Sequence, residues 1–103
     1  MAEDGSFRVK KFNGQNYQMW KMQMEDYLYQ RDLYQPLSGK TKKLMSMTDQ
    51  EWCILDRKAV RTIQLCLVAS VAFNISKEMT TRGLMLELAK LYDKPLASNR
   101  YFL

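Results

Sequence analysis

The sequence predicts an all-α fold, a compact bundle of four to five helices over residues 12–103. Apolar residues recur at spacings of three and four along most of the chain, as on the buried face of an amphipathic helix. No segment alternates polar and apolar residues in the manner of a half-buried strand. The 103 residues, of which 47% are hydrophobic and 26% charged, suffice for a single domain with its own core.

The first expected helix follows a polar start and a turn. Residues 1–11 contain few apolar side chains and predict a flexible lead-in. Asn13-Gly14 predicts a turn because both residues tolerate a positive φ. Asn16 is expected to cap a helix that begins at Tyr17.

Large side chains on this first helix predict a buried face. They recur at three- and four-residue steps, and the stripe comprises Tyr17, Trp20, Met24, Tyr27, Leu28, Arg31 and Tyr34. We expect Pro36 and Gly39 to end the helix. The basic segment SGKTKK at residues 38–43 resembles the tail of a phosphate-binding loop, but the earlier glycine and a preceding strand are missing. Nucleotide binding is therefore not expected.

The second expected helix begins with a capping box. Thr48 can accept from the third helical N–H, and Glu51 can reach back to the backbone of Thr48. The expected buried face consists of Trp52, Leu55, Ala59, Ile63 and Leu67. Basic side chains at Arg57, Lys58 and Arg61 occupy the opposite side.

A nearly continuous apolar run follows at residues 65–73, and the helical pattern before it favours a buried helix there. Residues 71–79 are expected to form a bend or a short separate helix. Thr80 or Thr81 can cap a further helix, whose aligned apolar residues are Leu84, Met85, Leu88, Leu91 and Tyr92. Gly83 weakens its first turn by about 1 kcal/mol relative to Ala, which suggests close packing at this position.

The composition excludes several kinds of active site. Because the chain has no His, it lacks a histidine base and a Cys/His zinc site. Cys53 and Cys66 lie on one expected helix, too far apart for a disulfide, and are expected to be buried, reduced thiols. We expect no enzymatic activity, no metal and no cofactor.

The charge and hydropathy patterns bear on location and partners. No apolar run approaches the ~18 residues of a transmembrane helix, and the start is too polar for a signal peptide. A cytoplasmic protein without a membrane partner is therefore expected. The whole net charge of +5 resides in residues 40–103, and this basic bias permits weak contact with RNA.

The pattern of aromatic, turn and core positions is similar to that of a known family. The opening positions are Phe12-Asn13-Gly14, Asn16-Tyr17, Trp20-Lys21, Met24-Glu25 and Leu28. The similarity continues through Trp52, ILDRKAVRTIQLCLVASVAFNI at residues 54–75 and LYDKPLASN at residues 91–99. In this order they resemble the amino-terminal region of Gag proteins of copia-type plant retrotransposons.

This resemblance implies a Gag capsid N-terminal-like fold and a role in assembling the particle that packages element RNA. The signature and core positions are Phe12, Gly14, Trp20, Met24, Leu28, Trp52, Leu55, Ile63, Leu67, Leu88 and Tyr92. In the family a helix near Ser98 continues and a zinc knuckle follows, whereas this sequence stops at Leu103. The knuckle, protease, integrase and polymerase functions are therefore not implied.

We expect the domain to self-associate through helix faces, as a homodimer or a higher oligomer, and to co-assemble with full-length Gag. A domesticated or truncated fragment would then interfere with the particle. The candidate interface residues are Met19, Met22, Tyr29, Tyr34, Tyr101 and Phe102. The alternative is a non-specific RNA-binding module, with candidate contacts at Lys40, Lys42, Lys43, Arg57, Lys58 and Arg61.

Overall fold

The computed structural model describes residues 9–40 and 43–93 of the chain. Within these ranges the protein forms four α helices and one 3-10 helix, and no strand. In chain order they are α1 (Tyr17–Gln30), the 3-10 helix η2 (Gln35–Ser38), α2 (Asp49–Leu65), α3 (Ala69–Asn74) and α4 (Thr81–Tyr92). The prediction of an all-α bundle is confirmed.

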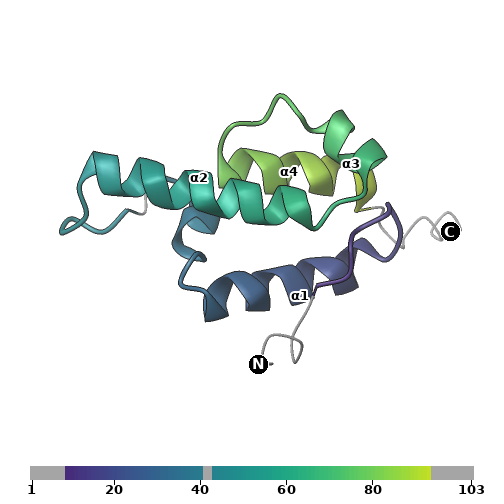
Figure 1. The fold of residues 1–103 in the computed structure, drawn as a ribbon, viewed down its shortest axis with the longest axis horizontal. Helices are drawn as coiled ribbons and strands as arrows, with labels where there is room; N and C mark the ends of the chain where they lie inside the picture. Colours follow the sequence, from purple (N-terminus) through teal and green to yellow (C-terminus); the bar gives the residue numbers. More distant parts are fainter. Residues whose placement is uncertain (1–8, 41–42, 94–103) are drawn as a thin grey trace, which may run out of the picture.

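The helices are arranged around α2. Figure 1 shows α2 along the length of the molecule, with α1 on one side of it and α4 on the other. The short helix α3 lies near the C-terminal end of α2, where the segment that leads into α1 also passes. The side of α1 opposite its buried residues carries exposed side chains such as Met22 and Tyr29.

The entry to α1 depends on left-handed backbone conformations. Gly14 adopts φ 101° and Asn16 adopts φ 55°, conformations that Gly and Asn accept more readily than other residues. The side chain of Asn13 accepts a hydrogen bond from the backbone N–H of Gln15 at 3.1 Å. Asn16 occupies the expected cap position, but its side chain makes no capping hydrogen bond. The helix start was therefore predicted correctly, and the capping interaction was not.

Helix α1 ends at Gln30, earlier than expected. Asp32 adopts φ 60°, which reverses the chain. The N–H of Leu33 donates to Leu28 O at 2.8 Å, and the N–H of Asp32 donates to Tyr29 O at 3.1 Å, as in a Schellman motif. This motif commonly contains Gly, and the Asp in its place explains why the sequence did not predict the stop. Pro36 lies in η2 instead.

The starts of α2 and α4 follow the sequence prediction. Thr48 Oγ1 accepts from Glu51 N at 3.0 Å, and Glu51 Oε1 accepts from Thr48 N at 2.9 Å, so the capping box is complete. At α4, Thr80 Oγ1 accepts from Gly83 N at 3.0 Å. A Cβ added at Gly83 would lie 2.7 Å from Glu78 Oε1 and 2.8 Å from Thr80 Oγ1, which confirms the close packing expected there.

The apolar run at residues 65–73 does not form one buried helix. Helix α2 ends at Leu65, and the chain then runs extended beside Phe12. Phe12 N donates to Cys66 O at 2.8 Å, and Val68 N donates to Phe12 O at 3.0 Å. The side chains of Leu65 and Phe73 are 74% and 78% exposed. The expected buried helix does not form here because backbone pairing with Phe12, more than 50 residues away, replaces the helical hydrogen bonds.

The core combines an aromatic cluster with aliphatic side chains from all four α helices. The Phe12 ring lies 5.0 Å from Trp20, 5.7 Å from Tyr17 and 5.2 Å from Tyr92 between ring centroids. The fully buried side chains of the same core include Met24, Leu28, Ile63, Ile75, Leu84 and Leu88. The large side chains near the start of the chain, Phe12, Tyr17, Trp20 and Met24, therefore serve mainly to build the core.

Several predicted core positions are less buried than the helical pattern indicates. Leu55 and Tyr92 are half-buried, and Tyr92 packs on the core cluster while its hydroxyl accepts from Asn74 at 3.0 Å. Cys53 is exposed and Cys66 half-buried, and neither forms a disulfide. The expectation that both thiols are buried was wrong, since Cys53 follows Trp52 directly and points off the buried face.

Candidate interaction surfaces

An open groove separates α1 from α2 on one face of the molecule. It has a volume of about 560 Å³. Its lining comes from α1, the loop after it and α2, and consists of Tyr27, Arg31, Leu33, Ile54, Arg57, Lys58, Arg61, Thr62, Leu65 and Cys66. We call this cavity the basic groove, because its lining residues include four cationic side chains and no acidic one.

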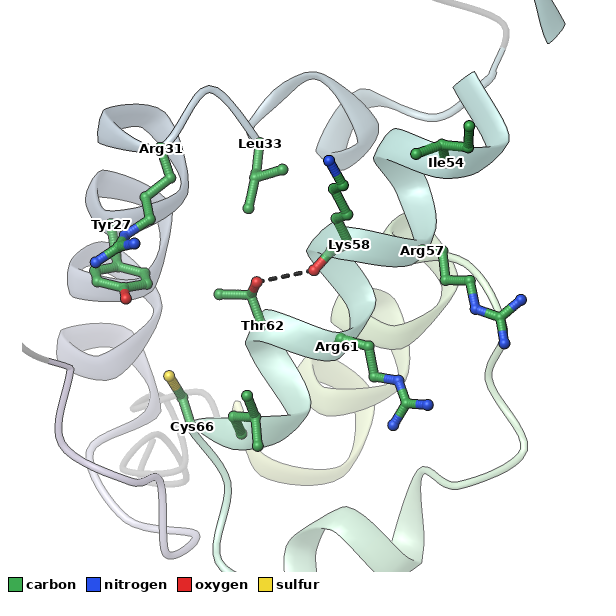
Figure 2. A pocket seen from close by; sticks show the side chains of 10 residues that line it. Tyr27, Arg31, Leu33, Ile54, Arg57, Lys58, Arg61, Thr62 and Cys66 are labelled. Atoms are coloured by element: carbon green, nitrogen blue, oxygen red, sulfur yellow. Dashed lines mark hydrogen bonds between the residues drawn. The ribbon is translucent and has the colours of Figure 1, made fainter. Parts of the chain in front are cut away.

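The cations lie at the rims of the basic groove. Figure 2 shows Arg31 and Tyr27 on the α1 side and Lys58 of α2 beside apolar Leu33, while the side chains of Arg57 and Arg61 point away from α1. The Arg31 guanidinium carbon lies 4.6 Å from the centroid of the Tyr27 ring, a cation–π contact. Among the described residues, no carboxylate pairs with Arg31, Arg57, Lys58 or Arg61.

The lining of the groove thus combines apolar side chains with a concentration of positive charge. Ile54 is 50% exposed and Leu65 is 74% exposed at its edges. At its inner end, burial raises the pKa of the Cys66 thiol, while the nearby Lys11 lowers it to a smaller extent. The thiol therefore stays neutral at physiological pH. Because the groove is lined by cations and apolar side chains, it is suited to a ligand with both acidic and apolar groups.

The candidate RNA contacts do not form a single surface. Arg57, Lys58 and Arg61 line the basic groove, whereas Lys40 and Lys43 do not. Lys43 donates to Met47 O at 2.6 Å and lies 3.6 Å from Asp49, while Lys40 lies 3.9 Å from the same carboxylate. Lys42 lies outside the described residues. The sequence did not point to Arg31, because its position on the expected buried stripe suggested packing.

The candidate interface residues of α1 and its following loop are exposed. Met19, Met22, Tyr29 and Tyr34 have 54%, 53%, 64% and 39% of their surface accessible. Tyr29 and Tyr34 also contact each other, with ring centroids 4.9 Å apart. The remaining two candidates, Tyr101 and Phe102, lie outside the described residues. The four described side chains are accessible to a partner, and their role at an interface stays a prediction.

Further apolar side chains are exposed elsewhere, and the helical pattern did not identify them. Besides Ile54, Leu65 and Phe73, they are Leu44, Met45, Met79, Leu86 and Leu91. Leu91 was expected on the buried face of its helix, but Leu84 and Leu88 take that position. These side chains are spread over α2, α3, α4 and the loops before α2 and α4, and apolar side chains scattered in this way are normal on a protein surface.

Two kinds of site are not found in the part of the chain that the structure describes. No group of three or more Cys, Asp and Glu side chains lies close enough to hold a metal ion there. Likewise, none of the helices over residues 9–40 and 43–93 has the length and apolar character needed to cross a membrane.

Comparison with known proteins gives one informative match. No protein-family profile matches the chain, and no solved structure matches it significantly. The chain is 36% identical over 98 residues to the retrovirus-related Pol polyprotein from transposon TNT 1-94 of Nicotiana tabacum. The match covers 94% of this chain and 7% of that polyprotein. The resemblance found in the sequence is thereby confirmed: the chain is homologous to the N-terminal region of the polyprotein of a copia-type plant retrotransposon.

Proposed function

We propose that the protein is a Gag capsid-like assembly module that self-associates through its helix faces. The observation that carries this proposal is the exposed apolar surface of α1, where Met19, Met22 and Tyr29 are each more than half accessible. These side chains are not needed by the core, which is already filled by Trp20, Met24 and their neighbours.

The homology and the chemistry of the surface support this proposal. The chain is homologous to the start of a retrotransposon polyprotein, and the resemblance to Gag leads us to expect a capsid module in this region. Met and Tyr are enriched at protein–protein interfaces, and Met adapts its shape to a partner. A contact made by a few exposed side chains is weak by itself, but many such contacts together hold an assembly strongly.

The direct test is the mass of the protein in solution against its concentration. Light scattering after size exclusion, on protein freed of nucleic acid, should give a mass that rises with concentration. Replacing Met22 by Arg should shift this rise to higher concentration, because a charge would be buried in the contact. A matched control is Met79→Arg, which changes a side chain that is 84% exposed on the loop before α4. A strict monomer at the highest concentration would refute the proposal.

A second candidate function, non-specific RNA binding, is favoured by the cations of the basic groove, which have no carboxylate partner among the described residues. Arg57, Lys58 and Arg61 can neutralise phosphates and release counterions. Among the lining residues, Tyr27 alone offers an aromatic ring, and the Arg31 guanidinium lies over it. The groove therefore offers no obvious platform for stacking of several bases.

RNA binding can be tested by fluorescence anisotropy with a labelled single strand at several salt concentrations. The RNA-binding function predicts an affinity that falls steeply with salt and a shallower slope after Arg57, Lys58 and Arg61 are changed to Gln. A dissociation constant weaker than about 10⁻⁴ M at physiological salt, the weak end of the non-specific range, would exclude it. Changing Lys40 and Lys43 to Gln gives a control of equal chemistry outside the groove.

Self-association would also allow the chain to join a longer polyprotein that contains the same region. An excess of this region, expressed by itself, would occupy these contacts and so would interfere with assembly. Co-expression with full-length Gag should then lower the yield of particles. A yield that stays constant at a large excess of this chain would contradict the interference.

A further inference from the structure

Four exposed residues of α1 form a stripe on the side opposite its buried residues. They follow one another at steps of three, four and three residues, and therefore share one face of the helix. From the N-terminal end this α1 stripe consists of Met19, Met22, Asp26 and Tyr29. Apolar side chains thus flank a central carboxylate, while the half-exposed Glu25 at its edge is paired with Lys21 at 4.0 Å.

An opposite arrangement occurs on α2, along the basic groove. Residues at steps of four, three and four again share a face, and all four are exposed. This α2 stripe consists of Ile54, Lys58, Arg61 and Leu65. Apolar side chains here flank two central cations, and Arg57 adds a third cation beside them.

The two stripes match in length, order and charge. At 1.5 Å per residue, the α1 stripe spans about 15 Å and the α2 stripe about 17 Å. If the helices lie side by side, the apolar ends meet apolar ends while Asp26 meets Lys58 and Arg61. We infer that the α1 stripe of one copy docks along the basic groove of a second copy. This inference rests on the proposed function and names the surfaces that carry it.

The geometry makes this contact heterologous. The exposed α1 stripe lies on the opposite side of α1 from its buried residues Trp20, Met24 and Leu28, whereas the basic groove opens between the two helices (Figure 2). One partner therefore cannot fill the groove and cover the stripe at the same time. Each copy instead contacts two others, one through each surface, and contacts of this kind produce rings or open filaments. Of the two forms expected from the sequence, a homodimer or a higher oligomer, this contact favours the higher oligomer.

The decisive experiment blocks each surface separately. Met22→Arg disables the stripe and Leu65→Arg disables the groove, and both positions are more than half exposed, so the fold should tolerate them. Each variant alone should need at least about a tenfold higher concentration to associate, the change in equilibrium constant that corresponds to about 1.4 kcal/mol. Mixed in equal amounts, they should form a 1:1 heterodimer that does not grow, because one intact stripe meets one intact groove. Met79→Arg should associate like the unmodified chain.

A charge exchange tests the polar centre of the contact. Asp26→Lys and Arg61→Glu should each weaken association, since each places like charges opposite one another. Combined in one chain, they should restore it, because the introduced lysine of one copy would then meet the introduced glutamate of the next. The inference would be overturned if the combined variant lost as much association free energy as the two single variants lose together. Circular dichroism at equal concentration confirms that the helices persist in every variant.

The possible outcomes separate this inference from the proposed function. If the unmodified chain associates and neither Met22→Arg nor Leu65→Arg weakens it, the docking inference fails while self-association stands. Association that ends at a dimer, or a mixture that remains monomeric, also overturns it. If the chain is a strict monomer, both proposals fail. If Arg61→Glu abolishes RNA binding and leaves association unchanged, the basic groove is a nucleic-acid site and the docking inference is overturned.

Discussion

At the scale of single residues, Tyr17 combines two roles that conflict in part. Its ring contacts Phe12 and Trp20 in the aromatic cluster, and only 4% of the residue is exposed. Its hydroxyl has no hydrogen-bond partner among the described residues. A buried polar group without a partner lowers the stability of the fold. Burial first, and then the charges of Asp93 and Glu25, raise the pKa of Tyr17 to about 12.

This shift predicts a loss of stability at alkaline pH. The unfolded chain releases the Tyr17 proton near the ordinary pKa of 10.0, whereas the folded protein holds it until about pH 12. Protonated Tyr17 therefore favours folding, and this contribution is complete below about pH 10 and is lost as the pH rises towards about 12. Urea unfolding followed by tryptophan fluorescence should show the loss, and Tyr17→Phe should remove it. The same loss in Tyr17→Phe as in the unmodified protein would refute this account. Tyr29→Phe controls for an exposed hydroxyl.

At the scale of the helices, the sequence predicted starts better than ends. The caps at Thr48 and Thr80 follow from side chains next to the first turn, so a local pattern reveals them. The end of α1 depends on a left-handed Asp32, and the end of α2 depends on pairing with Phe12. Neither can be derived from helical periodicity, because one is an unusual residue for its conformation and the other is a long-range contact.

The junction between α2 and α4 provides a second prediction. Asp56 Oδ1 accepts from the backbone N–H of Thr81 at 2.8 Å, and the Thr81 hydroxyl donates to Asp56 O at 3.2 Å. Thr81 is fully buried, so its N–H would lose its partner without this carboxylate. Asp56→Ala should lower the free energy of unfolding by about 1–3 kcal/mol. Asp56→Asn retains an acceptor oxygen, so its free energy of unfolding should fall clearly less. Urea titration of both variants measures the difference. Equal losses would indicate that charge, rather than the hydrogen bond, matters.

The segment before α1 provides a third prediction, through two phenylalanines that differ in burial. Phe12 is 2% exposed at the centre of the aromatic cluster, whereas Phe73 is 78% exposed on α3. Phe12→Ala should destabilise the domain by about 3–5 kcal/mol, a large part of the total for one of this size. Phe73→Ala should change it by less than about 0.5 kcal/mol. Thermal unfolding by circular dichroism measures both, and a large loss in Phe73→Ala would contradict the placement of α3.

At the scale of the whole molecule, the sequence predicted accessible residues better than it predicted surfaces. Met19, Met22 and Tyr29 stand off the buried stripe of α1, so periodicity alone identified them as accessible. The basic groove could not be identified in this way, because its two rims come from different helices. Arg31 of the α1 side and Arg57 and Arg61 of α2 line the same groove only because α1 packs beside α2.

The separation of charge across the molecule provides a last prediction. The α1 stripe bears Asp26 and the basic groove bears Arg31, Arg57, Lys58 and Arg61, so docking should bring opposite charges together. Raising the salt from about 50 to about 500 mM screens such pairs and should shift the association midpoint to higher concentration. Asp26→Asn should associate less readily at low salt and depend less on salt. Sedimentation velocity measures both quantities. Association that strengthens as salt rises would instead indicate a contact dominated by apolar burial.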